Sequence, residues 1–100
     1  MSQSMTNSRP PADEPFIQVL ETGEQDGVKV INVLVWACAE EPVDKCQFKN
    51  KMTQEEMIDE IGRVCEQDQR LNLQEMFIMI QYLIQEWNKG NIKEGDVLGK

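Results

Sequence analysis

Apolar residues gather in three segments of this 100-residue chain. The first is an almost unbroken apolar run at Val28–Ala39, with the sequence VKVINVLVWACA. The other two, within residues 53–66 and 72–90, place apolar residues three and four positions apart, the spacing of an amphipathic helix. Residues 1–12 show no such pattern and are mostly polar, so we expect them to form a disordered tail.

The apolar run at Val28–Ala39 is compatible with either a strand or a helix. Its β-branched residues favour a strand, which would form a hairpin with residues 16–21 across the sequence GEQDG. Its length is ordinary for a helix and long for a strand. In a helix Lys29 and Asn32 share one polar face, whereas in a strand they point to opposite faces and both faces need cover. An aspartate before the run and a proline after it suit helix ends, so we predict a helix and keep the strand as the alternative.

The segment that begins at Thr53 has a clear helix signature. Thr53 and Glu56 have the spacing of a capping box, in which each side chain bonds the backbone N–H of the other residue. The apolar face that follows consists of Met57, Ile58, Ile61, Val64 and Cys65. Gly62 lies inside this helix, where it costs ~1 kcal/mol relative to Ala. It either permits a close helix crossing or is simply tolerated.

A second helix is predicted to begin at Asn72, with Glu75 in the capping-box position, and to end at Gly90. Its core-facing stripe consists of Leu73, Met76, Phe77, Ile80, Leu83, Ile84 and Trp87. Three further apolar residues lie outside that stripe: Ile78, Met79 and Tyr82. A helix that is apolar nearly all round is either central in its fold or covered by a partner. We therefore predict these three residues as partner-binding.

The remaining segments carry weaker signals. Residues 14–21 suit a short helix or a strand, and residues 41–52 are predicted to be a loop with a basic cluster around Phe48. The segment 91–100 is expected to be a loose tail from which a few apolar side chains could dock.

The predicted fold is therefore mostly all-α: a single small domain of three to four helices over residues 13–90, between tails at 1–12 and 91–100. The alternative is an α+β fold in which an N-terminal β-hairpin precedes two helices.

The charge balance limits the kinds of molecule that the chain is expected to bind. Eighteen acidic and ten basic residues leave a net charge of -8, which opposes nucleic-acid binding because phosphate contacts need Lys and Arg. Four acids, Glu55, Glu56, Asp59 and Glu60, cluster on the polar side of the helix that begins at Thr53. Such a cluster suits a protein partner with a basic surface, although it also suits a solvated face.

The usual catalytic groups are scarce. The chain has no histidine, and its serines all lie within residues 1–12, so we predict a protein that is not an enzyme and needs no cofactor. Three cysteines without a CxxC pair indicate neither a disulfide framework nor a metal site. Cys38 and Cys65 suit a core, whereas Cys46 lies among lysines that could lower its pKa. A thiol-dependent redox protein is therefore a minor alternative.

These features favour a non-enzymatic, acidic protein-binding module that acts stoichiometrically, as inhibitors, immunity proteins, anti-activators and chaperones do. The alternative is a homo-oligomeric structural or assembly protein, such as a homodimer, with the last helix as its interface. No signal peptide is visible, and the longest apolar run is too short to span a bilayer. We therefore expect no membrane partner, and a location in the cytoplasm, or in the host cytoplasm if the protein is viral.

Overall fold

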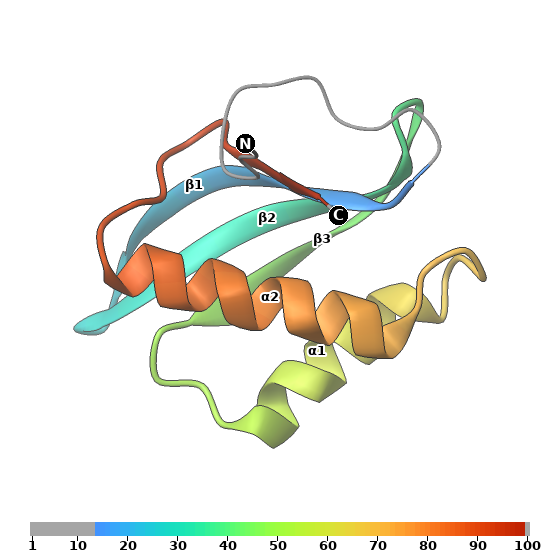
Figure 1. Cartoon of the computed structure of the whole chain (residues 1–100). Helices are drawn as coiled ribbons and strands as arrows, with labels where there is room; N and C mark the ends of the chain where they lie inside the picture. Colours follow the sequence, from blue (N-terminus) through green and yellow to red (C-terminus); the bar gives the residue numbers. More distant parts are fainter. Residues whose placement is uncertain (1–13, 100) are drawn as a thin grey trace.

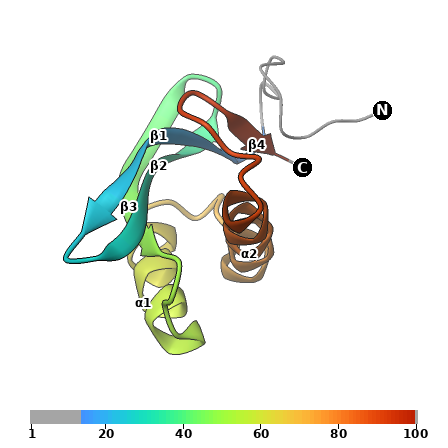
Figure 2. The same ribbon diagram turned by 90° about the vertical axis from the view of Figure 1, so that its left-hand side faces the viewer.

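Strands and helices alternate in blocks along residues 14–99, the part of the chain that the computed structural model describes. The strands are β1 (Phe16–Gln25), β2 (Val28–Cys38), β3 (Glu41–Lys49) and β4 (Val97–Gly99), and the helices are α1 (Gln54–Cys65) and α2 (Leu73–Asn88). The four strands form one antiparallel sheet in the order β3-β2-β1-β4. Both helices lie on the same side of this sheet, so the domain has two layers (Figures 1 and 2).

The prediction of a mostly all-α domain is wrong, and the α+β alternative fits. The apolar run predicted as a helix is strand β2, which pairs with β1 on one side and β3 on the other. Asp26 and Gly27 join β1 to β2 with φ angles of 53° and 78°. Two positive φ angles define the type I′ turn of a two-residue hairpin, for which Asp-Gly is a preferred sequence. Asp26 thus belongs to a hairpin turn, whereas the helix prediction used it as an N-cap.

Two further segments also join the sheet. Residues 41–52 were expected to form a loop, but β3 occupies most of them and buries Cys46 and Phe48, two positions apart. The lysines between and beside these residues obscure that alternation in the sequence. At the other end, β4 lies within the expected tail at 91–100, pairs with β1 and buries Leu98. The predicted tail at 1–12 lies outside the described residues.

Both predicted helices are confirmed, including their start signals. The Thr53 side chain accepts a hydrogen bond from the Glu56 N–H, and the Glu56 carboxylate accepts one from the Thr53 N–H. Asn72 caps α2 by accepting from the Glu75 N–H. Gly90 follows α2 with a φ of 83°, a left-handed conformation that suits glycine after a helix.

The hydrophobic core fills the space between the helices and one face of the sheet. From β2 it takes Ile31, Val33, Val35 and Ala37, which alternate with residues on the opposite face. Ile61 of α1 and Ile80 of α2 pack into the same cluster and are 2% and 1% exposed. The core therefore uses only half of the apolar side chains that β2 supplies.

Candidate protein-binding surfaces

The four acidic residues of α1 predicted to bind a partner divide into two pairs. Glu56 belongs to the capping box, and its hydrogen bonds with Thr53 lower its pKa. Glu60 accepts hydrogen bonds from the Gln47 N–H of β3 at 3.1 Å and from the Arg63 side chain. Glu55 and Asp59 are exposed and make no ion pair or hydrogen bond with residues 14–99. The structure thus leaves only the second pair for a partner.

Glu60 and its neighbours also cap the outer edge of β3. The Arg63 guanidinium donates to the Lys45 carbonyl at 2.8 Å and to the Asp44 carboxylate at 2.7 Å. The Lys45 N–H donates to the other Asp44 oxygen, also at 2.7 Å. Side chains therefore occupy three backbone groups in the middle of β3 that an added strand would need.

The hydrogen bonds at the edge of β3 also lower the pKa of a carboxyl group. Hydrogen bonds from the Gln67 amide, the Lys45 N–H and Arg63 lower the pKa of Asp44 from 3.8 to about 2. Asp44 is therefore ionised at neutral pH and joins β3 to α1.

The three apolar residues of α2 predicted to bind a partner do not share one environment. Ile78 and Tyr82 are 57% and 41% exposed. Met79 is only 8% exposed and belongs to the core, so its prediction as a surface residue is wrong. The physical reason is the width of the buried stripe: the face of α2 that packs toward the sheet extends around the helix as far as Met79.

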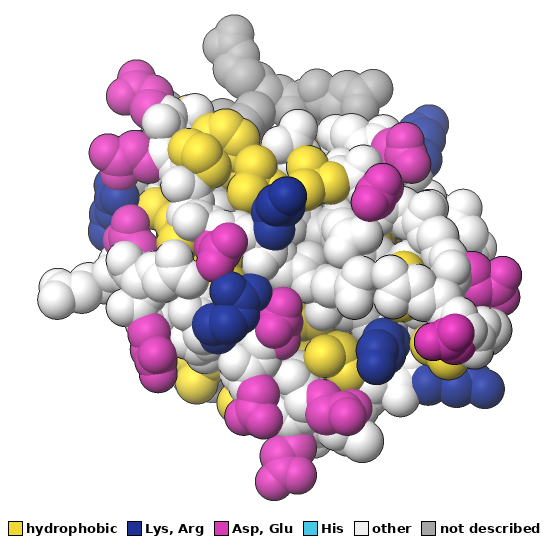
Figure 3. Space-filling view, turned by 180° about the vertical axis from the view of Figure 1, so that it is seen from behind, with side chains coloured by type: hydrophobic (Ala, Val, Ile, Leu, Met, Phe, Trp, Pro, Cys, Tyr) yellow, Lys and Arg dark blue, Asp and Glu magenta, His cyan; other side chains and the backbone are white. Residues whose placement is uncertain are grey.

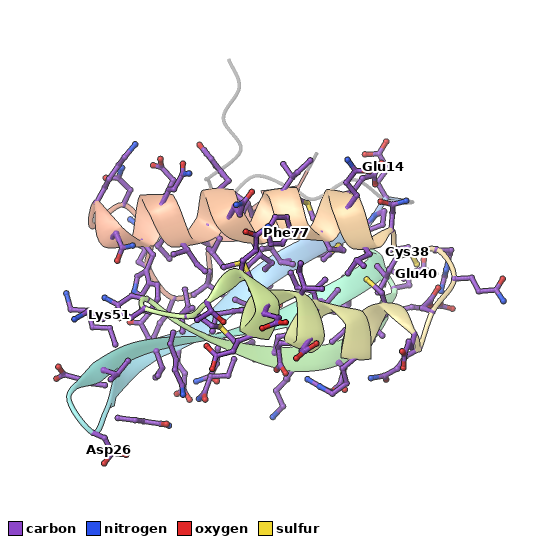
Figure 4. All side chains as sticks on the ribbon, turned by 90° about the horizontal axis from the view of Figure 1, so that it is seen from below. Glu14, Asp26, Cys38, Glu40, Lys51 and Phe77 are labelled. Carbon is purple, nitrogen blue, oxygen red and sulfur yellow. The ribbon has the colours of Figure 1, made fainter. Side chains whose placement is uncertain are left out.

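A different apolar surface lies between the two helices. We call it the interhelical strip: Ile58 and Cys65 of α1 with Leu73, Phe77 and Ile84 of α2. Ile58 and Leu73 are 37% and 42% exposed, and the other three are half-buried. Figure 4 shows Phe77 between α1 and α2 on the side away from the sheet. Tyr82 lies five residues after Phe77, which places it about 140° around the helix and away from the strip.

The second candidate surface is the uncovered face of the sheet. We call it the outer sheet face; its apolar members are the buried Phe16 and Val30 and the half-buried Leu20, Leu34 and Trp36. The rings of Phe16 and Trp36 stack with centroids 5.4 Å apart, and the Trp36 indole donates to the Gln18 side chain at 3.2 Å. Leu20, Leu34 and Trp36 remain half-buried. Figure 3 shows hydrophobic side chains gathered over this side of the molecule beside a basic one.

The same face continues into a polar region toward the β1–β2 turn. The Asn32 amide donates to the Glu21 carboxylate at 3.3 Å and accepts from the Gln47 amide at 3.1 Å, so one hydrogen-bonded row crosses β1, β2 and β3. A shallow depression of about 430 Å³ lies over this region, with Leu20 and Lys45 also in its lining. The outer sheet face thus offers apolar and polar contacts side by side.

The lysines near Cys46 do not lower the pKa of its thiol, so the structure does not support the minor alternative of a reactive cysteine. This cysteine is 3% exposed, and burial raises the pKa of its thiol to about 12, with the nearby Glu60 carboxylate adding to the effect. Lys45 and Lys49 alternate with Cys46 along β3 and point to the opposite face of the sheet, so they do not activate the thiol. Burial also raises the pKa of the half-buried Cys65.

Comparisons with known proteins identify no relative. No family model, no curated protein and no solved structure matches this chain. Within residues 14–99 no group of three or more Cys, Asp or Glu side chains is placed to hold a metal ion. Neither helix in this part of the chain is long and apolar enough to cross a membrane.

Proposed function

We propose that this protein is a stoichiometric protein-binding module whose partner presents a basic amphipathic helix to the interhelical strip. The observation that carries the proposal is the position of exposed acids beside exposed apolar residues on the same side of α1. Glu55, Asp59 and Glu66 are exposed there, and none makes an ion pair with residues 14–99.

The shape of the strip favours a helix as its ligand. α1 and α2 run in roughly opposite directions side by side, so their exposed apolar residues form a band parallel to the helices (Figures 1 and 4). A third helix with apolar residues three and four positions apart would place one apolar stripe on this band. Burial of Ile58 and Leu73 would supply the hydrophobic part of the binding free energy.

The charges favour a basic ligand. The chain carries a net charge of -8, and the acidic groups of α1 lie along one border of the strip. Lysine or arginine on the flank of the partner helix would face these carboxylates. Exposed charges of this kind act mainly on the association rate and on its dependence on salt.

Gly62 provides a further contact point. It lies in α1 between Ile58 and Cys65, and a Cβ atom built on it meets nothing within 4 Å. Of the two possibilities left open for Gly62, a close helix crossing is therefore not seen within residues 14–99. The free space above it would instead let the partner helix approach α1 closely.

Ile78 and Tyr82 are an alternative contact site for the partner helix. They are the most exposed apolar residues of the central part of α2, and their side chains lie on the flank away from the strip. Two scattered apolar residues are common on protein surfaces. They therefore serve as the competing site in the test.

The proposal can be tested with a synthetic helical peptide as long as α2, with leucines on one face and lysines on both flanks. Titration into the labelled protein, followed by amide chemical shifts, should perturb α1 and α2 around Ile58 and Phe77. A peptide with glutamates in place of the lysines, and a peptide of the same composition without periodicity, should bind at least tenfold more weakly.

Variants of the protein provide the matched controls. Ile58→Ser and Gly62→Leu should weaken peptide binding, whereas the double change Ile78→Ser and Tyr82→Ser should leave it unchanged. Loss of binding only in the double variant would move the site to the other flank of α2. Equal binding of all three peptides would contradict the proposal, since neither charge nor periodicity would then be recognised.

A further inference from the structure

The outer side of β2 is more apolar than a solvated face requires. An antiparallel sheet with one open face normally alternates apolar residues inside with polar residues outside. Here Leu34 and Trp36 continue the apolar pattern on the outside, and Leu20 of β1 lies beside them. These side chains remain half-buried among residues 14–99, so a second layer would remove further apolar surface from water.

Self-association through the β3 edge is blocked. In the middle of β3, the side chains of Glu60, Arg63 and Asp44 already bind the backbone groups of Lys45 and Gln47, as described above. The opposite edge strand, β4, has only three residues. A second copy would therefore meet this sheet face to face, at the spacing of about 10 Å between stacked sheets.

The charges on the outer sheet face are arranged so that the face complements itself. Lys45 and Lys49 lie on the outer side of β3, and Glu21 lies on the outer side of β1; the β2 residues between them are Val30, Asn32 and Leu34. Neither lysine makes an ion pair with residues 14–99. A two-fold axis parallel to the strands places β3 of one copy over β1 of the other. Each pair of lysines then faces the glutamate of the other copy.

We propose that the outer sheet face binds a second copy of this chain, so that the protein is a dimer of two sheets packed face to face. Leu20, Leu34 and Trp36 form the centre of the interface, and Glu21 faces Lys45 and Lys49 at its border. This interface is separate from the interhelical strip, which lies on the opposite side of the domain and stays open in the dimer (Figure 2).

A charge-exchange experiment tests this arrangement. Sedimentation velocity of the full chain over a wide concentration range should show a monomer–dimer equilibrium. The variant Lys45→Glu with Lys49→Glu and the variant Glu21→Lys should each raise the dimer dissociation constant about tenfold or more, because like charges then face each other. An equimolar mixture of the two variants should dimerise again, since both contacts are then attractive. Only an interface that joins β3 of one copy to β1 of the other predicts this recovery.

A pair of single substitutions locates the interface. Leu34→Lys should abolish the dimer, and Ile78→Lys, on the exposed flank of α2, should leave it intact; circular dichroism checks that both variants fold. The reverse result would place a dimer interface on α2 and overturn the proposal.

A monomer at all concentrations would also overturn it. In that case acrylamide quenching of Trp36, in a Trp87→Phe background, would show whether the face is open to another partner or covered by the chain itself. Because the helical peptide and the dimer use different sides of the domain, failure of one experiment leaves the other intact.

Discussion

The two faces of the sheet receive apolar side chains from the same strand, yet within residues 14–99 only one of them is covered by helices. On the inner side of β2, Ile31, Val33 and Val35 pack under both helices and are fully buried. On the outer side, Leu34 and Trp36 alternate with them and stay half-buried, whereas Val30 is buried. A strand that is apolar on both faces normally lies between two layers. Within residues 14–99 the helices thus cover one face of the sheet, and the proposed dimer would cover the other.

The largest expected effect is the difference in unfolding free energy between side-chain truncations in the core and truncations on the outer sheet face. Ile61→Ala and Ile80→Ala should each cost ~2–5 kcal/mol of unfolding free energy, because they leave cavities in a packed core. A loss of that size would unfold much of a small domain. Leu34→Ala should cost clearly less in the monomer, measured by urea denaturation at low protein concentration. Equal losses at inner and outer positions would mean that the outer face is already packed within the chain.

Cys46 tests whether the inner side of β3 belongs to the same core. Cys46→Ser should lower the unfolding free energy by ~1–3 kcal/mol, because it buries a hydroxyl group at a position where the core offers no hydrogen-bond partner within residues 14–99. In the native protein Cys46 should react with a thiol reagent only after unfolding, since its thiol is buried and its pKa is raised to about 12. Mass spectrometry of the labelled cysteines identifies which thiol reacts. Labelling of Cys46 faster than that of Cys38 would contradict its placement.

Asp44 tests the cap on the β3 edge through pH. Its pKa is about 2 in the folded protein and 3.8 ordinarily, so the ionised carboxylate stabilises the fold above that ordinary value. The stabilisation is lost as pH falls from 3.8 toward 2. Asp44→Asn should therefore be less stable than the wild type at neutral pH, and the difference should vanish toward pH 2.

Glu55→Gln is the matched control for this pH experiment, because Glu55 has no described ion pair to lose. A wild-type minus Asp44→Asn difference that stayed constant with pH would show that the carboxylate does not hold β3 to α1.

The smallest expected effect is at Gly62. Gly62→Ala should raise the unfolding free energy by at most ~1 kcal/mol, because Ala favours a helix interior and the added Cβ meets nothing within 4 Å. Thermal unfolding of the variant and the wild type under the same conditions measures this difference in stability. A lower stability would mean that the interhelical strip is tighter than the structure shows, which would weaken the contrast between its open surface and the packed core.

The candidate surfaces could be predicted only in part. The acids of α1 and the excess apolar surface of α2 are visible in the sequence, but which acids remain unpaired depends on Gln47 and Arg63, which approach Glu60 in space. The exposure of Ile78 and Tyr82 followed from the helical spacing. The burial of Met79 did not, because it depends on how far the sheet extends around α2. The outer sheet face was missed, since it exists only if Val28–Cys38 is a strand.

The helices were determined by the sequence alone, because their signals are local. The cap at Thr53 or Asn72, the apolar stripe and, for α2, the glycine after its end lie within or next to the segment that they describe. The sheet was decided only by the tertiary structure. β2 has a composition that suits both a helix and a strand, and its choice depends on hydrogen bonds to β1 and β3 on either side. β3 and β4 carry even weaker local signals, because short strands gain their stability from partners that are distant in sequence.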